Sequence, residues 1–296
     1  MFSTCRLAKK LYFIAGEQDA KYPFSHGLYI DADLKVLIDS GFGRGGREFV
    51  LARGNVDVII NTHFHYDHAR GNHFFPGAEI WAHYLDTPAL LSEELLFAYT
   101  GFERLNPRIS MEENFPEFMK ARQVARELAD GEILDFGGVV LQVIHLPGHT
   151  PGHIGFYHPE GGIMFSSDID LSPFGPWYGN LCSDPDLFIA SIRKIKALKP
   201  RIIVTSHAGI ITDRITERLA AYEAVFEERD NLILEALAVE KSLVELVDEK
   251  LIYKKFFEPE RIIKFFEQVM LEKHLEHLIS QGKVIHTGNN CYKARS

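Results

Sequence analysis

The stretch Val56-Asp-Val-Ile-Ile60-Asn-Thr-His63-Phe-His65-Tyr-Asp67-His68 joins an apolar strand pattern to three imidazoles and a carboxylate. The spacing of these polar side chains does not suit a regular element. A helix does not place residues i and i+2 on one face, and a strand would turn His68 away from the others. A tight turn after the strand can direct all four side chains toward one point. Because imidazoles and carboxylates bind zinc and related ions, the stretch predicts a metal site.

Short apolar runs bounded by turn residues predict strands in the first two thirds of the chain. These runs are Lys10–Ile14, His26–Ile30, Lys35–Ile38, Val56–Ile60, Ala78–Ala82, Val139–Ile144, Gly162–Phe165 and Ile202–Val204. Helical patterns lie between them, at Gly46–Ala52, Glu94–Tyr99, Phe115–Ala129 and Pro185–Ala197. Alternating strands and helices predict a protein of the α/β class.

Further acids and imidazoles come directly after other predicted strands. Asp39 follows Lys35–Ile38, and His149, Asp168 and His207 each follow a later strand. In α/β sheets, functional sites lie beyond the strand ends. Five strands that each deliver an acid or an imidazole to such a place favour a metal centre over core packing.

The composition excludes several classes of protein. Hydrophobic residues make up 46% of the 296 residues and charged residues 25%, which are ordinary values for a globular chain. The net charge of −9 disfavours general binding of nucleic acid or anionic membranes. Cys5, Cys182 and Cys291 lack metal or redox spacing and predict free thiols. Because no long apolar run is present, we expect a cytoplasmic protein without membrane contact.

The chain is predicted to divide into two domains, 1–212 and 213–296. Within the first, residues 84–131 predict a helical insertion near the site, either as a cap on the core or as a lid over the substrate. In the second, Glu217–Ala238, Ser242–Lys250 and Glu258–Gln281 predict three helices, and residues 283–293 predict a hairpin with a Gly-Asn turn. This order is typical of a winged-helix-like domain.

Taken in order, these motifs resemble the metallo-β-lactamase-fold superfamily of hydrolases over residues Leu11 to Ile211. The resemblance implies an αββα sandwich with a C-terminal helical domain and a site for two divalent ions, with zinc expected first and iron or manganese as alternatives. The implied ligands are His63, His65 and His149 for one ion, Asp67, His68 and His207 for the other, and Asp168 as the bridge. Asp39 matches an acid that orients the turn without binding metal.

The resemblance implies a hydroxide nucleophile generated between the two ions, with Asp67 as the catalytic residue that aims it. A proton donor for the leaving group is not assigned, and Tyr66, Tyr178 and His153 are candidates. Two positions depart from the family pattern. Ser167 and Ser206 stand where many relatives have glycine, so a modest shift of Asp168 or His207 is expected.

Three substrate classes remain open. The stretch from His145 to His153 is similar to glyoxalase II-like thioesterases, which favours a small ester, thioester or lactone, although Ser206–Gly209 does not match their pattern. The C-terminal third is similar to a branch that includes animal mitochondrial endoribonucleases and implies single-stranded RNA. However, Glu258–Gln281 holds five acids against three bases and would repel phosphate. An iron oxidoreductase is the third alternative, and the intact His65 counts against its flavodiiron branch. A homodimer is also left open.

Overall fold

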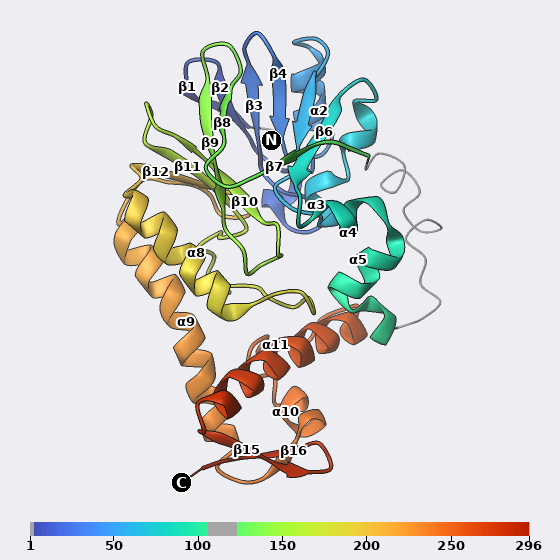
Figure 1. The fold of residues 1–296 in the computed structure, drawn as a ribbon, viewed down its shortest axis with the longest axis vertical. Helices are drawn as coiled ribbons and strands as arrows, with labels where there is room; N and C mark the ends of the chain where they lie inside the picture. Colours follow the sequence, from blue (N-terminus) through green and yellow to red (C-terminus); the bar gives the residue numbers. More distant parts are fainter. Residues whose placement is uncertain (1–2, 106–122, 296) are drawn as a thin grey trace.

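Two β-sheets packed face to face form the centre of the molecule, and helices cover their outer faces (Figure 1). This computed structural model describes residues 3–105 and 123–295. The fold therefore has the two sheets and flanking helices of the predicted α/β sandwich. Among the described residues, no helix is both long and apolar enough to cross a membrane.

The first sheet contains seven strands in chain order. They are β1 (Thr4–Ala8), β2 (Leu11–Ile14), β3 (Gly27–Asp31), β4 (Lys35–Ile38), β5 (Val58–Ile60), β6 (Glu79–His83) and β7 (Val124–Leu128). Strands β1 to β4 pair antiparallel, whereas β4 to β7 are parallel. The carboxyl ends of β4, β5 and β6 therefore meet at one edge, where Asp39 and the His63–His68 motif follow.

The second sheet has six strands in the order β13-β12-β11-β10-β9-β8. They are β8 (Ile133–Asp135), β9 (Val140–His145), β10 (Ile154–His158), β11 (Ile163–Ser167), β12 (Ile202–Thr205) and β13 (Gly209–Ile211). Strands β11 and β12 pair in parallel, and the other neighbours in this sheet pair antiparallel. The carboxyl ends of β11 and β12 deliver Asp168 and His207 to the same edge, facing the ligands from the first sheet.

Three layers of buried apolar side chains hold the sandwich together. The central layer joins the inner faces of the sheets, with residues such as Ile38, Val143 and Phe165. The outer face of the first sheet packs on α2 (Arg44–Leu51) through Val50. The outer face of the second packs on α8 (Pro185–Leu198) through Phe188. The remaining helices of this part are short: α1 (Glu17–Ala20), α3 (Tyr66–Ala69), η1 (Asn72–Phe74), α4 (Thr87–Leu91), α5 (Glu93–Thr100) and η2 (Phe102–Arg104).

The C-terminal region begins with the long helix α9 (Ile215–Ala236), which leads away from the sandwich (Figure 1). It continues with β14 (Lys241–Ser242), α10 (Leu243–Glu249), α11 (Glu260–Ser280), β15 (Val284–Gly288) and β16 (Cys291–Ala294). The last three strands form a small sheet in the order β14-β16-β15. The three helices and the hairpin lie where they were expected, while the winged-helix assignment and the boundary at residue 212 stay predictions.

The buried apolar cluster of this region is continuous with the outer layer of the second sheet. One cluster contains Met164 of β11, Phe188 of α8, Phe226 of α9 and Met270 of α11. The C-terminal helices therefore share one buried apolar cluster with the outer face of the second sheet.

One sequence-based prediction is wrong in part. Phe115–Ala129 was expected to be a helix, but residues 124–128 form strand β7, parallel to β6 at the edge of the first sheet. Arg126 of this strand lies over the Trp81 ring, 4.4 Å from its centroid. This polar edge strand is therefore held by a contact with β6 that the pattern of apolar residues does not indicate. The insertion 84–131 is thus not wholly helical, and its part from 106 to 122 lies outside the described residues.

The close approach of Gly148 to α8 leads to the first prediction. A Cβ at Gly148 would lie 2.3 Å from the backbone nitrogen of Phe188, and the φ angle is +128°. Gly148→Ala should lower the free energy of unfolding by about 3 kcal/mol and displace the adjacent His149. Gly131→Ala is the control, because it also has positive φ but open space, and should cost only about 1 kcal/mol. Equal losses in urea titrations of the two metal-free variants would show that the contact does not matter.

Candidate metal centre

The motif after β5 folds as a turn followed by a single helical turn. His63 and His65 lie in the turn, while Asp67 and His68 belong to α3, which begins at Tyr66. His63 and His68 are completely buried. The strand end, the turn and the short helix together direct all four side chains inward, as the spacing predicted.

The first group of ligand atoms consists of His63, His65, His149 and Asp168, all within 4.8 Å of one another. His65 Nδ1 lies 2.9 Å from His63 Nε2 and 3.0 Å from His149 Nε2. The fourth atom, Asp168 Oδ2, lies 3.2 Å from His149 Nε2. A zinc ion bonded to four such atoms at about 2.0–2.1 Å would separate them by about 3.3 Å. The group therefore fits a four-coordinate ion.

The second group consists of Asp67, His68 and His207. Asp67 Oδ2 lies 3.4 Å from His207 Nε2 and 3.7 Å from His68 Nε2. His68 Nε2 is buried, and its 3.1 Å approach to Asp168 Oδ1 does not have the geometry of a hydrogen bond, so this nitrogen has no hydrogen-bond partner among the described residues. A buried imidazole nitrogen without a partner is costly, and a cation among these three side chains would satisfy it.

Asp168 lies between the two groups. Its Oδ2 contacts His149 of the first group, whereas its Oδ1 is 3.1 Å from His68 Nε2 of the second. The structure thus brings together all seven predicted ligands and puts Asp168 in the place expected of a bridge. Two His/Asp groups in this arrangement fit a dinuclear metal site.

The outer ring nitrogens of all five ligand histidines have partners, and the partner of His63 is the Thr62 hydroxyl, 3.1 Å from Nδ1. His149 Nδ1 donates to the Trp177 carbonyl at 2.9 Å and His207 Nδ1 to the Ala20 carbonyl at 2.7 Å. The other two partners are side chains: His68 Nδ1 contacts Asp39 Oδ2 at 2.8 Å, and His65 Nε2 contacts the Asn180 amide at 2.6 Å. Such partners fix the tautomer and leave the inner nitrogen free for metal.

Asp39 performs the orienting role predicted for it. This completely buried carboxylate accepts from His68 Nδ1 and also from the backbone N–H of Thr62, at 2.9 Å. Its second contact with Thr62 is through the hydroxyl, at 2.8 Å. Asp39 therefore fixes both the start of the turn and one ligand ring without entering either ligand group.

The charge distribution of the site favours cations. Burial and neighbouring imidazoles lower the pKa of His63 and His65 well below the ordinary value, so both rings are neutral and able to bind metal. Burial alone would also lower the pKa of His68, but the surrounding carboxylates, Asp168 first, raise it well above the ordinary value. A proton is thus strongly attracted to the place where a metal ion would bind.

The two departures from the family pattern are accommodated locally. Ser167 adopts a left-handed backbone with a φ of +50°, which explains why glycine suits this position. Its hydroxyl contacts the Thr62 hydroxyl at 2.8 Å and the Ser206 hydroxyl at 3.2 Å. These contacts join the turn after β5 to the ends of β11 and β12, and Asp168 and His207 remain within their ligand groups.

Sequence reasoning missed three residues that support the ligands: Trp177 and Asn180, which lie in a loop without strand or helix pattern, and Asp86. The Asp86 carboxylate accepts from the Phe64 N–H at 3.2 Å, the Thr150 hydroxyl at 2.7 Å and the Gly152 N–H at 2.6 Å. It therefore joins the turn after β5 to the His149 loop. Because Asp86 follows β6, the rule that found Asp39 could have found it too.

Two of the candidate proton donors are occupied within the fold. His153 Nε2 accepts from the backbone N–H of Asp168 at 3.2 Å, and its ring is completely buried behind the ligands. The Tyr178 hydroxyl is buried and contacts His274 and Arg229. Neither arrangement favours proton delivery to a substrate.

The fold and these two groups are those of a metal-dependent hydrolase. Residues 27–207 match the family model described as the metallo-beta-lactamase superfamily. The chain belongs to this superfamily.

Several relatives are similar over much of the chain. The hydroxyacylglutathione hydrolase GloC of Haemophilus influenzae is 33% identical over 170 residues, which cover 53% of this chain and 71% of that protein. A hydroxyacylglutathione hydrolase of Erythrobacter litoralis is 29% identical over 176 residues, or 59% of this chain and 57% of that one. The matches to these enzymes thus leave part of each uncovered.

Solved structures extend the similarity to the C-terminal helices. A metallo-beta-lactamase family protein from Thermus thermophilus is 26% identical with a TM-score of 0.78, and the match covers 98% of this chain and 100% of that one. A second structure, described as a di-iron-bound form, is 26% identical with a TM-score of 0.50 over 66% of this chain and 93% of that one.

The site predicts a pH dependence of the metal-free protein. Burial alone would lower the pKa of His207. The carboxylates of Asp168 and Asp67 outweigh this effect and raise the pKa from the ordinary value of 6.5 to about 9. A histidine whose pKa is raised in the folded state stabilises the fold. This stabilisation is complete at pH values below the unfolded-state pKa and is lost as the pH rises through the folded-state pKa. The Tm of metal-free protein should therefore fall between about pH 6.5 and 9. His207→Gln should make the Tm of the metal-free protein depend less on pH in this range. An unchanged pH dependence in that variant would show that His207 does not cause it.

Proposed function

We propose that this protein hydrolyses a small acyl thioester with two divalent ions, zinc in the first instance. The observation that carries the proposal is the pair of His/Asp groups joined through Asp168. The substrate class is supported by the 33% identity to a hydroxyacylglutathione hydrolase. The thiol part of the substrate is not assigned, because Ser206–Gly209 departs from the glyoxalase II-like pattern.

When bound, two such ions activate water for attack on a carbonyl and stabilise the negative charge that develops. The residues of this chain position those ions. His63, His65 and His149 would hold one ion and Asp67, His68 and His207 the other, with Asp168 shared. Asp67 is 7% exposed and would orient the attacking group.

The charges of α11 give no support to RNA as a substrate. Lys273 donates to the carbonyls of Leu181 and Ser183, at 3.0 and 2.5 Å, and Lys264 pairs with Glu260 at 3.2 Å. Lys273 is thus used within the fold, whereas Lys264 and Glu260 form an ion pair at the surface. One of the five acids counted on the sequence, Glu267, is buried and also faces inward. We therefore propose a small-molecule substrate.

A substrate panel tests this proposal directly. The purified chain would be assayed against S-lactoylglutathione, acetyl thioesters of other thiols, p-nitrophenyl esters, a lactone and labelled single-stranded RNA. We expect the thioesters to be turned over at a higher kcat/KM than the lactone or the RNA, because thiolates leave readily without a dedicated proton donor, whereas alkoxides do not. Efficient RNA cleavage with no thioester turnover would contradict the proposal.

Replacement of the shared carboxylate tests the metal assignment. Asp168→Ala should lower kcat/KM by about three orders of magnitude or more and reduce the metal bound per chain, measured by elemental analysis. Asp186→Ala is the control, because that side chain is 76% exposed and belongs to neither ligand group. Full metal content and full rate in Asp168→Ala would overturn the two-ion assignment, and the same analysis of wild-type protein distinguishes zinc from iron.

A further inference from the structure

The loop segment 174–180, between β11 and α8, contacts the outer nitrogens of two ligands of the first group. The Trp177 carbonyl accepts from His149 Nδ1 at 2.9 Å, and the Asn180 amide lies 2.6 Å from His65 Nε2. Because His65 offers its Nδ1 to the ion, its Nε2 carries the proton, and Asn180 accepts it only with its amide turned so that the oxygen takes the place of the nitrogen that faces the ring here. Both rings therefore depend on the position of this segment.

Arg229 of α9 holds the backbone of the loop segment 174–180. Its guanidinium donates to the carbonyl of Pro176 at 2.6 Å and to that of Phe174 at 2.7 Å. It also donates to the hydroxyl of Tyr178 at 2.9 Å. Arg229 is only 4% exposed. Its buried charge is therefore stabilised by the hydrogen bonds that it donates to the loop segment 174–180.

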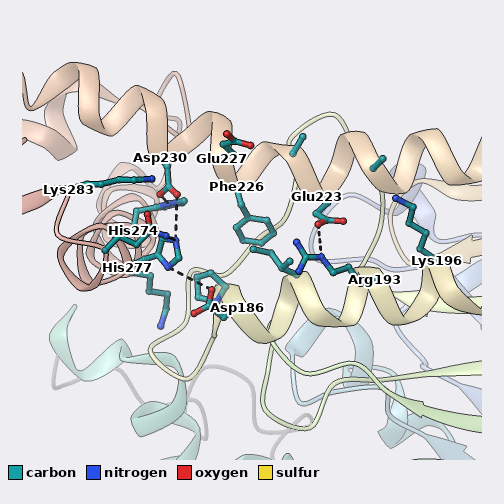
Figure 2. Close-up of a pocket in the computed structure, with 16 residues that line it drawn as sticks. Asp186, Arg193, Lys196, Glu223, Phe226, Glu227, Asp230, His274, His277 and Lys283 are labelled. Atoms are coloured by element: carbon teal, nitrogen blue, oxygen red, sulfur yellow. Dashed lines mark hydrogen bonds and ion pairs between the residues drawn. The ribbon is translucent and has the colours of Figure 1, made fainter.

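His274 of α11 continues this chain of hydrogen bonds. Its Nε2 lies 2.5 Å from the Tyr178 hydroxyl, and its Nδ1 lies 2.7 Å from Asp230 of α9 (Figure 2). Since Arg229 can only donate, Tyr178 accepts from it and donates to His274, which in turn donates through Nδ1 to Asp230. Burial lowers the pKa of His274 and so favours the neutral ring that this order requires.

The C-terminal region holds the same loop at a second point. Trp177 Nε1 donates to the Tyr253 hydroxyl at 2.7 Å. The backbone N–H groups of Tyr253 and Ile252 donate to the buried carboxylate of Glu267, at 2.9 and 3.0 Å. All of these supports come from residues after 213, and none of them belongs to the two sheets that provide the ligands.

We propose that His274 is a positioning residue for the first metal group and acts through Tyr178 on the loop that orients His149 and His65. The C-terminal helices thereby set the affinity of a metal site to which they contribute no ligand. The inference rests on the proposed metal centre and does not depend on which substrate is hydrolysed.

The chain offers a matched control on the same helix. His277 is half-buried and lines the same cavity of about 530 Å³ as His274 and Asp230 (Figure 2). It faces Asp186 at 3.7 Å and Asp230 at 3.8 Å, but it does not contact Tyr178. Replacing it perturbs the same helix and the same cavity without breaking the hydrogen-bond chain.

The test measures metal binding by chelator competition, together with the visible spectrum of Co²⁺-substituted protein. Loss of a residue that supports a ligand lowers metal affinity about 10–100-fold. His274→Leu and Tyr178→Phe should each weaken binding of the ion held by the first group by about tenfold or more and shift the Co²⁺ spectrum. His274→Gln, whose amide oxygen can accept from Tyr178, should restore much of the affinity, and His277→Leu should match wild type.

The outcomes separate this inference from its alternatives. Wild-type affinity and spectrum in both His274→Leu and Tyr178→Phe would overturn it, and so would an equal loss in His277→Leu. If His274→Leu does not fold, Tyr178→Phe still decides, because its ring keeps the stacking on Phe226 at 5.1 Å. Metal affinity is measured without substrate, so a wild-type protein inactive on thioesters would refute the proposed substrate and leave this test unaffected.

Discussion

The metal centre depends on hydrogen bonds that the ligand histidines make away from the ligand groups. All five rings have a partner on the outer nitrogen: Asp39, Asn180, the Thr62 hydroxyl, and the carbonyls of Trp177 and Ala20. Such partners fix both the ring orientation and the nitrogen that remains free. They come from the ends of β4 and β5, the loop segment 174–180 and helix α1 before β3. The surrounding structure is therefore organised around keeping five imidazoles and two carboxylates close together.

Much of this organisation could be predicted from the sequence, because the strands carry local signals. The apolar run ending at Ile60 and the spacing of the residues after it indicate both a strand and the turn that follows, and each further ligand stands at a comparable strand end. The resemblance to the superfamily then grouped the ligands as the structure does. Ser167 also shows how a residue other than glycine is tolerated at this position. Its hydroxyl makes hydrogen bonds with Thr62 and Ser206 that glycine could not make.

The parts that could not be predicted depend on contacts between distant residues. Strand β7 has a polar sequence and is recognised only by its pairing with β6. Asn180 and Trp177 lie in a loop whose course is set by Arg229 and His274, about 50 and 100 residues further along the chain. The excess of acids over bases in α11 does not by itself show that the helix surface repels phosphate, because Glu267 turns inward and accepts hydrogen bonds from backbone N–H groups. Composition alone does not show which charges face the solvent.

Each ligand group draws on both sheets of the sandwich. His63 and His65 follow β5 of the first sheet, whereas His149 and Asp168 follow strands of the second, and the other group is divided in the same way between α3 and β12. A backbone hydrogen bond from Ile154 to Thr62, 2.9 Å long, crosses the same boundary. Bound ions would act as cross-links between the two halves of the core. The halves could then separate only if metal were released, which makes metal loading a source of resistance to partial unfolding and proteolysis.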